Sequence, residues 1–151
     1  MRYTKIFVVR WGECDVNGHM RNTVYSEYGV ETRVCYLAEH GFPFSRIEEI
    51  GLGPVILREE IDYLHELRLG ETVEVDCTRL GLSPDGARFK LAHDFWRPGG
   101  KKAARVVLLG GWLDLRARKL TPPPDDLRDA MASIPAGEPY EELPPLRRGA
   151  K

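Results

Sequence analysis

Cysteine and histidine are scarce in this sequence, and neither is arranged as a cross-link or a metal ligand. Its 151 residues include three cysteines and four histidines, and no CxxC pair occurs among them. Widely spaced cysteines in odd number do not form a disulfide framework, and the histidines lack the spacing of a zinc site. We therefore expect no structural metal and no disulfide. A chain of this length needs neither, because folding buries roughly 70% of its unfolded surface.

The sequence also lacks an excess of charge and a long apolar run. It contains 22 Lys and Arg residues against 23 Asp and Glu residues, which gives a net charge of −1. Such a balance creates no field that would draw the protein to nucleic acid or to an anionic membrane. No segment has the roughly 20 apolar residues of a membrane-spanning helix, and the first residues do not form a signal peptide. We expect a cytoplasmic protein that neither binds nucleic acid nor inserts into membranes.

Several hydrolase and nucleotide-binding motifs are missing as well. The chain has no G-x-S-x-G sequence and no glycine-rich phosphate-binding loop, which excludes the common serine-hydrolase elbow and the P-loop. No segment indicates a helix-turn-helix, which argues against a DNA-binding regulator.

The pattern of apolar residues predicts five strands and two helices. Alternation of apolar and polar residues predicts strands over 3–10, 54–67, 72–82, 87–96 and 101–119, with Gly110-Gly111 marking a bulge or a close backbone approach. A long helix is predicted from Asn22 to about Leu37, because apolar residues recur there at helical spacing and Gly41 and Pro43 follow. A short helix is predicted from Asp125 to about Ser133.

This order of elements predicts the fold class. One strand, one long helix and four further strands form an α+β domain in which a meandering antiparallel sheet curls around a single helix. We assign residues 1–135 to this domain and 136–151 to an irregular, Pro-rich tail that has little to bury. One helix covers only one face of the sheet, so we expect the protein to pair into a homodimer or homotetramer.

Residues that can carry chemistry gather between the first strand and the long helix. Glu13 and Asp15 are separated by one residue, Asn17-Gly18 is a strong turn dipeptide, and Asn22 stands at the helix start. A helix start offers unpaired N–H donors that suit a developing oxyanion, and a carboxylate beside it can act as nucleophile or general base. The simpler interpretation is that Asp15 holds an Asx turn and Asn22 caps the helix.

The stretch from Arg10 to Asn22, RWGECDVNGHMRN, followed by Tyr25 early in the helix, resembles the opening of hotdog-fold acyl-CoA thioesterases. The similarity is greatest to the 4-hydroxybenzoyl-CoA thioesterase-like family. Glu13 and Asp15 match its acidic pair, with Glu where Asp is more usual, and the segments 61–64 and 69–71 are similar to its second strand and following turn. The resemblance covers about residues 3–120. It implies the hotdog fold, in which an antiparallel sheet is wrapped around one long central helix, here with a short C-terminal helix added.

The resemblance implies an acyl-CoA thioesterase, which releases a carboxylic acid and free coenzyme A. By this match, Asp15 attacks the thioester carbonyl or activates a water to do so, and the backbone amide of Asn22 polarises the carbonyl oxygen. The resemblance implies no cofactor, since coenzyme A is part of the substrate. Some relatives carry His or Tyr at the position of Asn22, so the acid–base help of such a side chain is missing here.

Four more residues are candidates for binding the substrate. His19 and Tyr25 lie near the proposed centre in the sequence, and either line the acyl pocket or serve as a turn residue and a core residue. Arg58 and Glu59 interrupt an otherwise apolar strand. A charge on the apolar face is costly without a partner, so Glu59 either faces the active site across a dimer interface or pairs with an arginine.

Two alternative functions stay open at this point. The first is a thioesterase for acyl groups on acyl carrier protein, an acidic partner that requires a basic patch beside the site. The second is a non-catalytic acyl-CoA-binding protein, against which Asp15 argues, because a binding protein gains nothing from a carboxylate at the carbonyl.

Overall fold

The described residues, 2–147 of the computed structural model, form one seven-stranded sheet with three α-helices. The sheet order is β1-β3-β4-β5-β2, with β6 added on β5 and β7 on β3. All strand pairs are antiparallel except β3 with β7. The strands are β1 (Tyr3–Val8), β2 (Leu52–Tyr63), β3 (Thr72–Leu82), β4 (Arg88–Trp96), β5 (Lys102–Asp114), β6 (Lys119–Leu120) and β7 (Ala136–Glu142). The helices are α1 (Val24–Glu39), α2 (Phe44–Ile50) and α3 (Asp125–Ala132), preceded by a 3₁₀ turn at Trp11–Glu13.

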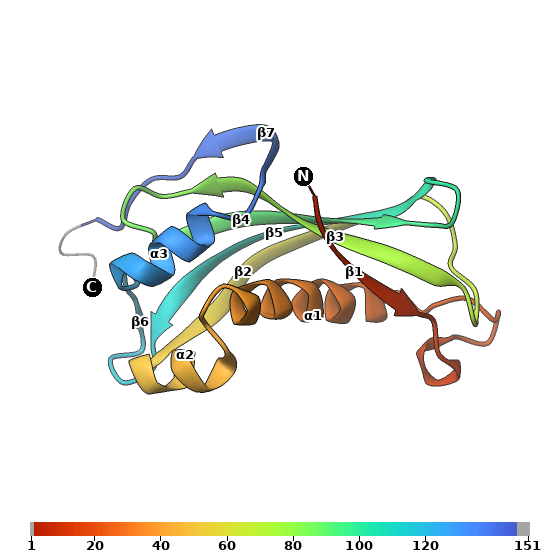
Figure 1. Ribbon diagram of the computed structural model, residues 1–151, viewed down its shortest axis with the longest axis horizontal. Coiled ribbons are helices and arrows are strands. Elements are labelled where there is room, and N and C mark those ends of the chain that lie inside the picture. Colours follow the sequence, from red (N-terminus) through yellow and green to blue (C-terminus); the bar gives the residue numbers. More distant parts are fainter. Residues whose placement is uncertain (1, 148–151) are drawn as a thin grey trace.

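The sheet curls over helix α1, which lies along its concave side (Figure 1). This arrangement is the predicted one, an α+β fold with an antiparallel sheet wrapped around one long helix. Among the described residues, no helix is long and apolar enough to cross a membrane.

Helix α1 is held by two buried clusters, one toward each of its ends. Near its start, Tyr25 and Tyr28 pack with Phe95 of β4 and with valines of β3. Toward its end, Leu37 packs with Trp112 of β5 and with apolar residues of α2 and α3. Each buried side chain of this size contributes roughly 1.5–3 kcal/mol, so the two clusters fix the helix start firmly against the sheet.

Gly110 marks a close backbone approach, as predicted. A Cβ atom at this position would lie 2.5 Å from the Phe89 ring and 2.8 Å from the carbonyl oxygen of Val55. The irregularity in the ladder falls on the partner strand, where the β2–β5 register shifts between Ile56 and Arg58. Only glycine lets the three strands β4, β5 and β2 pack this closely here.

Three sequence predictions are wrong in detail. Helix α2 was not predicted, although Pro43 at its start and Gly51 at its end, with a φ of 81°, are the usual helix boundary residues. The predicted final strand over 101–119 ends at Asp114, and a turn precedes the two-residue β6.

The tail from residue 136 was predicted to be irregular, but Ala136–Glu142 form β7. This strand lies alongside the outer part of β3 in parallel orientation, as Figure 1 shows. Residues 148–151 of the predicted tail lie outside the described residues.

Candidate active site

The loop between β1 and α1 is fastened to the segment that follows β2. The backbone N–H of Met20 donates to the carbonyl of Leu67 at 2.7 Å, and His19 pairs with Arg68 in an isolated antiparallel bridge. Met20 also bridges back to Cys14 within the loop. These backbone bonds give the loop a fixed shape, which a reactive group on it requires.

Glu13, the first residue of the acidic pair, is a buried structural residue with 7% of its surface exposed. Its carboxylate accepts hydrogen bonds from the Tyr28 hydroxyl at 2.7 Å and from the Arg10 backbone N–H at 2.9 Å. Burial opposes ionisation of this carboxyl, but the bonds from Tyr28 and Arg10 outweigh it and hold its pKa below the ordinary value. Glu13 therefore anchors the loop to helix α1 as an ionised group.

Asp15, the second residue of the pair, is exposed and holds a turn with only one of its two oxygens. Its Oδ1 atom accepts the backbone N–H of Asn17 at 2.8 Å and that of His19 at 3.3 Å. Within residues 2–147, Oδ2 has no hydrogen-bond partner. The Asx turn and the reactive role are therefore compatible, because the turn orients the carboxylate and leaves one oxygen for chemistry.

Asn22 lies in the turn that leads into helix α1. The turn is closed by a bond from the Val24 N–H to the Arg21 carbonyl at 3.1 Å, and the Asn22 carbonyl accepts the Tyr63 hydroxyl at 3.2 Å. No acceptor among residues 2–147 pairs with the backbone N–H of Asn22. Thr23, the residue before the helix, makes no side-chain capping bond. The helix start therefore presents an unpaired donor where a partial positive charge accumulates.

Asp15 and Asn22 line the same pocket, which has a volume of about 320 Å³. Four of the six predicted site residues meet in it, since His19 and Tyr25 line it as well. The other lining residues are Met20, Tyr63, Leu64, His65 and Glu66.

Aromatic rings and a contact between a histidine and a carboxylate shape this pocket. Tyr25 is only 3% exposed and packs edge-on against Tyr63, with ring centroids 5.1 Å apart. Burial raises the pKa of the Tyr25 phenol to about 12, so it stays neutral at physiological pH. His19 forms a short contact through Nε2 with the carboxylate of Glu66. Tyr25 is thus both a core residue and part of the pocket wall.

Arg58 and Glu59 do not line this pocket. Glu59 lies on the side of β2 that faces helix α1 and accepts a hydrogen bond from the Ser26 hydroxyl. Arg58 pairs with Glu60 and borders a different depression, together with Lys90 of β4 and Glu141 of β7. Neighbouring residues of a strand point to opposite faces, which separates the two. Within one chain, the structure does not bring them to Asp15.

The far wall of the pocket runs from Tyr63 to Glu66, and of these residues only Tyr63 is expected there from the sequence, as an aromatic side chain able to line an acyl pocket. These residues directly follow or end β2, and they reach Asp15 only because the sheet carries them to the helix start. Leu64, His65 and Glu66 are not predicted as site residues, because the sequence predicts them to continue the strand over 54–67, whereas β2 ends at Tyr63.

A model of the family described as "Thioesterase-like superfamily" matches residues 9–131. No curated protein matches in sequence.

Solved structures of similar shape include several named as acting on, or solved with, coenzyme A compounds. The hypothetical protein SAV2348 from Staphylococcus aureus, in complex with CoA, has a TM-score of 0.80 at 20% identity, over 87% of this chain and 82% of that one. Slr0204, a 1,4-dihydroxy-2-naphthoyl-CoA thioesterase from Synechocystis, has a TM-score of 0.78 at 17% identity, over 88% and 97%. The gentisyl-coenzyme A thioesterase BH1999 has a TM-score of 0.74 at 24% identity, over 86% and 99%. At these identities the likeness confirms the predicted hotdog fold.

Proposed function

This chain belongs to the thioesterase-like superfamily, and from that premise we propose that it hydrolyses thioesters of coenzyme A at the Asp15 pocket. The predicted class of enzyme, a thioester hydrolase, is confirmed at the level of the family. One observation carries the proposal for this particular site. Asp15, with its unpaired Oδ2, and Asn22, with its unpaired backbone N–H, line a single pocket.

In the proposed reaction, the thioester carbonyl oxygen accepts a hydrogen bond from the Asn22 N–H. The charge that develops on this oxygen is stabilised by the donor and by the start of helix α1. Asp15 Oδ2 either attacks the carbonyl carbon or removes a proton from the water that attacks it. In the first case the coenzyme A thiolate leaves and an acyl–Asp15 anhydride forms, which water then hydrolyses. In the second case water adds directly, and the collapse of the adduct expels the thiolate.

The two routes differ in whether the oxygen of water can enter the Asp15 carboxylate. In a single turnover in ¹⁸O-water, direct attack by water places the label in the released acid. Attack by Asp15 gives an unlabelled acid when water opens the anhydride at the Asp15 carbonyl, and leaves the label on Asp15. Label found on the Asp15 peptide by mass spectrometry therefore identifies attack by Asp15, whereas label in the acid alone also results when water opens the anhydride at the acyl carbonyl.

The choice of coenzyme A as carrier is supported by the similar structures, one of which was solved with CoA and two of which are named CoA thioesterases. The aromatic wall formed by Tyr25 and Tyr63 suits an aryl group or a medium aliphatic chain. The cytoplasmic location and the paired assembly remain predictions, and β2, at one edge of the sheet, offers a strand for such pairing.

The test measures hydrolysis of a panel of acyl-CoAs (short, medium and long aliphatic, benzoyl and hydroxybenzoyl). Release of the coenzyme A thiol is the signal. Asp15→Asn is the decisive variant, because an Asn oxygen can still hold the Asx turn while the carboxylate is lost. We expect a drop in kcat/KM of about 100-fold or more, which corresponds to roughly 2.7 kcal/mol. Asp129→Asn, exposed on helix α3, is the matched control and should behave as wild type.

Equal activity of the Asp15→Asn and wild-type proteins would refute the assignment. If the protein cleaves acyl groups from acyl carrier protein but not from coenzyme A, the proposed carrier, coenzyme A, is wrong and the carrier-protein alternative is correct. Binding of acyl-CoA without turnover of either substrate would favour the non-catalytic alternative.

A further inference from the structure

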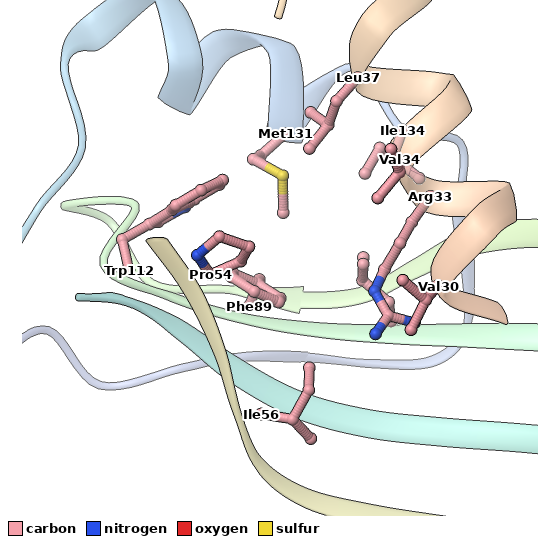
Figure 2. Close-up of a pocket in the computed structure, with 11 residues that line it drawn as sticks. Val30, Arg33, Val34, Leu37, Pro54, Ile56, Phe89, Trp112, Met131 and Ile134 are labelled. Carbon is pink, nitrogen blue, oxygen red and sulfur yellow. The ribbon is translucent and has the colours of Figure 1, made fainter. Parts of the chain in front are cut away.

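A second cavity lies between the later part of helix α1, helix α3 and the sheet, apart from the Asp15 pocket. Its volume is about 250 Å³, and it shares no lining residue with the Asp15 pocket. Leu37, Phe89 and Met131 are among the apolar residues around it (Figure 2). An apolar cavity of about 150 Å³ takes up benzene, so this one has room for a ligand of roughly ten carbon atoms.

Among the described residues, Arg33 is the one charged side chain that lines the cavity, and the nearby carboxylate of Glu59 acts on its charge without forming an ion pair with it. Its guanidinium lies 3.2 Å from Nε2 of His93, and among residues 2–147 it makes no ion pair with a carboxylate. Arg33 is partly buried, and this burial holds its pKa below the ordinary value, although a guanidinium remains charged. Figure 2 shows its side chain reaching down from α1 beside Val30.

His93 cannot supply the missing negative charge. Its Nδ1 atom lies 2.8 Å from the carbonyl oxygen of Asp76, which can only accept, so Nδ1 carries the hydrogen and Nε2 is left as an acceptor for Arg33. Full burial, together with the neighbouring Arg33 charge, lowers the pKa of His93 to about 3. His93 is therefore neutral, and it satisfies only one of the five N–H donors of the guanidinium.

The opposite side of the cavity also carries an unused donor. Trp112 is fully buried, and its indole N–H has no hydrogen-bond partner within the described part of the chain. In Figure 2, Trp112 and Arg33 lie on opposite sides of the cavity. Native proteins rarely leave a buried donor unpaired, so the Trp112 N–H, together with the guanidinium across the same apolar space, favours a ligand that bears acceptor oxygens.

We propose that this cavity is a binding site for a small apolar carboxylic acid. The carboxylate pairs with the Arg33 guanidinium, a charge-assisted contact that suits its forked geometry. The chain or ring of the acid occupies the space between Leu37, Phe89 and Met131. The inference does not depend on the proposed function, but acids of this class are what hydrolysis of an acyl thioester releases. The enzyme would then bind its own class of product at a place separate from Asp15.

The test compares octanoate with 1-octanol, which have the same chain but differ in charge, by isothermal titration calorimetry on the full chain. We expect the wild type to bind octanoate at least 10-fold more tightly than octanol. Arg33→Met should lose this preference while its affinity for octanol changes less than threefold, and Arg33→Lys should keep part of it. Replacing a partly buried charge by an apolar side chain of similar length is usually tolerated, and thermal unfolding of each variant checks this.

Two further variants locate the site. Val34→Phe, at the cavity rim, should weaken both ligands, whereas Asp15→Asn should leave both affinities unchanged. The proposal is overturned if neither ligand binds, if the acid preference survives in Arg33→Met, or if Asp15→Asn abolishes binding. No turnover enters these measurements, so they fail or succeed independently of the acyl-CoA assay.

Discussion

The hydroxyl of Tyr28 on helix α1 donates a 2.7 Å hydrogen bond to the buried carboxylate of Glu13 in the loop that carries Asp15. This contact joins the two halves of the candidate active site, because the helix start supplies the Asn22 N–H and the loop supplies the carboxylate. It also explains why one acidic residue of the pair is buried while the other is exposed.

Removing the Tyr28 hydroxyl should destabilise the protein. Tyr28→Phe leaves a buried, charged acceptor without one of its donors, and we expect a loss of about 2 kcal/mol in the free energy of unfolding. Urea denaturation measures this loss of unfolding free energy. Tyr63→Phe is the control, since Tyr63 is about half exposed (51%) and its bond to Asn22 is longer, at 3.2 Å. A double-mutant cycle with Glu13→Gln should show strong coupling, and additive effects would contradict the contact.

The ionisation of Glu13 should make stability depend on pH. Its pKa is lower in the folded state than the ordinary value of 4.5. Its contribution is therefore fully present above pH 4.5 and is lost as the pH falls through the folded-state pKa. The stability advantage of wild type over Glu13→Gln should shrink between pH 6 and pH 3 in urea titrations. A difference that stays constant over this range would show that Glu13 is not held ionised by the fold.

The backbone N–H of Asn22, and not its side chain, is expected to stabilise the oxyanion. Asn22→Pro removes the backbone donor together with the side chain, whereas Asn22→Ala removes the side chain alone, and proline is favoured at the second position of the turn that Arg21 and Val24 close. We expect kcat to fall 100- to 1,000-fold in Asn22→Pro and less than tenfold in Asn22→Ala. Circular dichroism and thermal unfolding establish that both variants are folded. If Asn22→Pro is as active as Asn22→Ala, the oxyanion donor lies elsewhere.

Gly110 should not tolerate even a methyl group. A Cβ atom there would lie 2.5 Å from the Phe89 ring and 2.8 Å from a backbone oxygen of β2, and the backbone oxygen cannot rotate away. We expect Gly110→Ala to cost about 3 kcal/mol of unfolding free energy. The matched control is Gly12→Ala, since a Cβ atom at Gly12 meets nothing within 4 Å. Similar melting temperatures for the two variants would contradict the packing described here.

Most of the sheet and the central helix could be predicted, because their signals are local. Alternating apolar residues mark β3 and β4 almost to the residue, and helical spacing marks α1. β7 carries no such signal: it is largely exposed, it contains Pro139, and it exists as a strand only because β3 offers an edge for it. Exposed edge strands often carry charged residues and proline, which prevent pairing with other chains, and their sequences therefore resemble those of loops.

The candidate site was predictable on one side only. Asp15, His19, Asn22 and Tyr25 are close in sequence, and a known family pattern connects them. The opposite wall comes from the end of β2, more than 35 residues later, and no spacing rule links the two. Glu59 illustrates the limit: the sequence leaves it either facing the active site across a dimer interface or paired with an arginine, and within one chain it accepts a hydrogen bond from Ser26 of helix α1.

The outer edge of β3 is divided between the two ends of the chain. β1 pairs with residues 72–77, and β7 pairs beyond them with Arg79, Gly81 and Leu82. A chain cut after residue 135 would keep helix α3 but uncover the second part of this edge, with backbone donors and acceptors open to any passing strand. Strand β7 thus protects this edge of β3 from pairing with other chains. We expect a protein truncated after residue 135 to be less soluble.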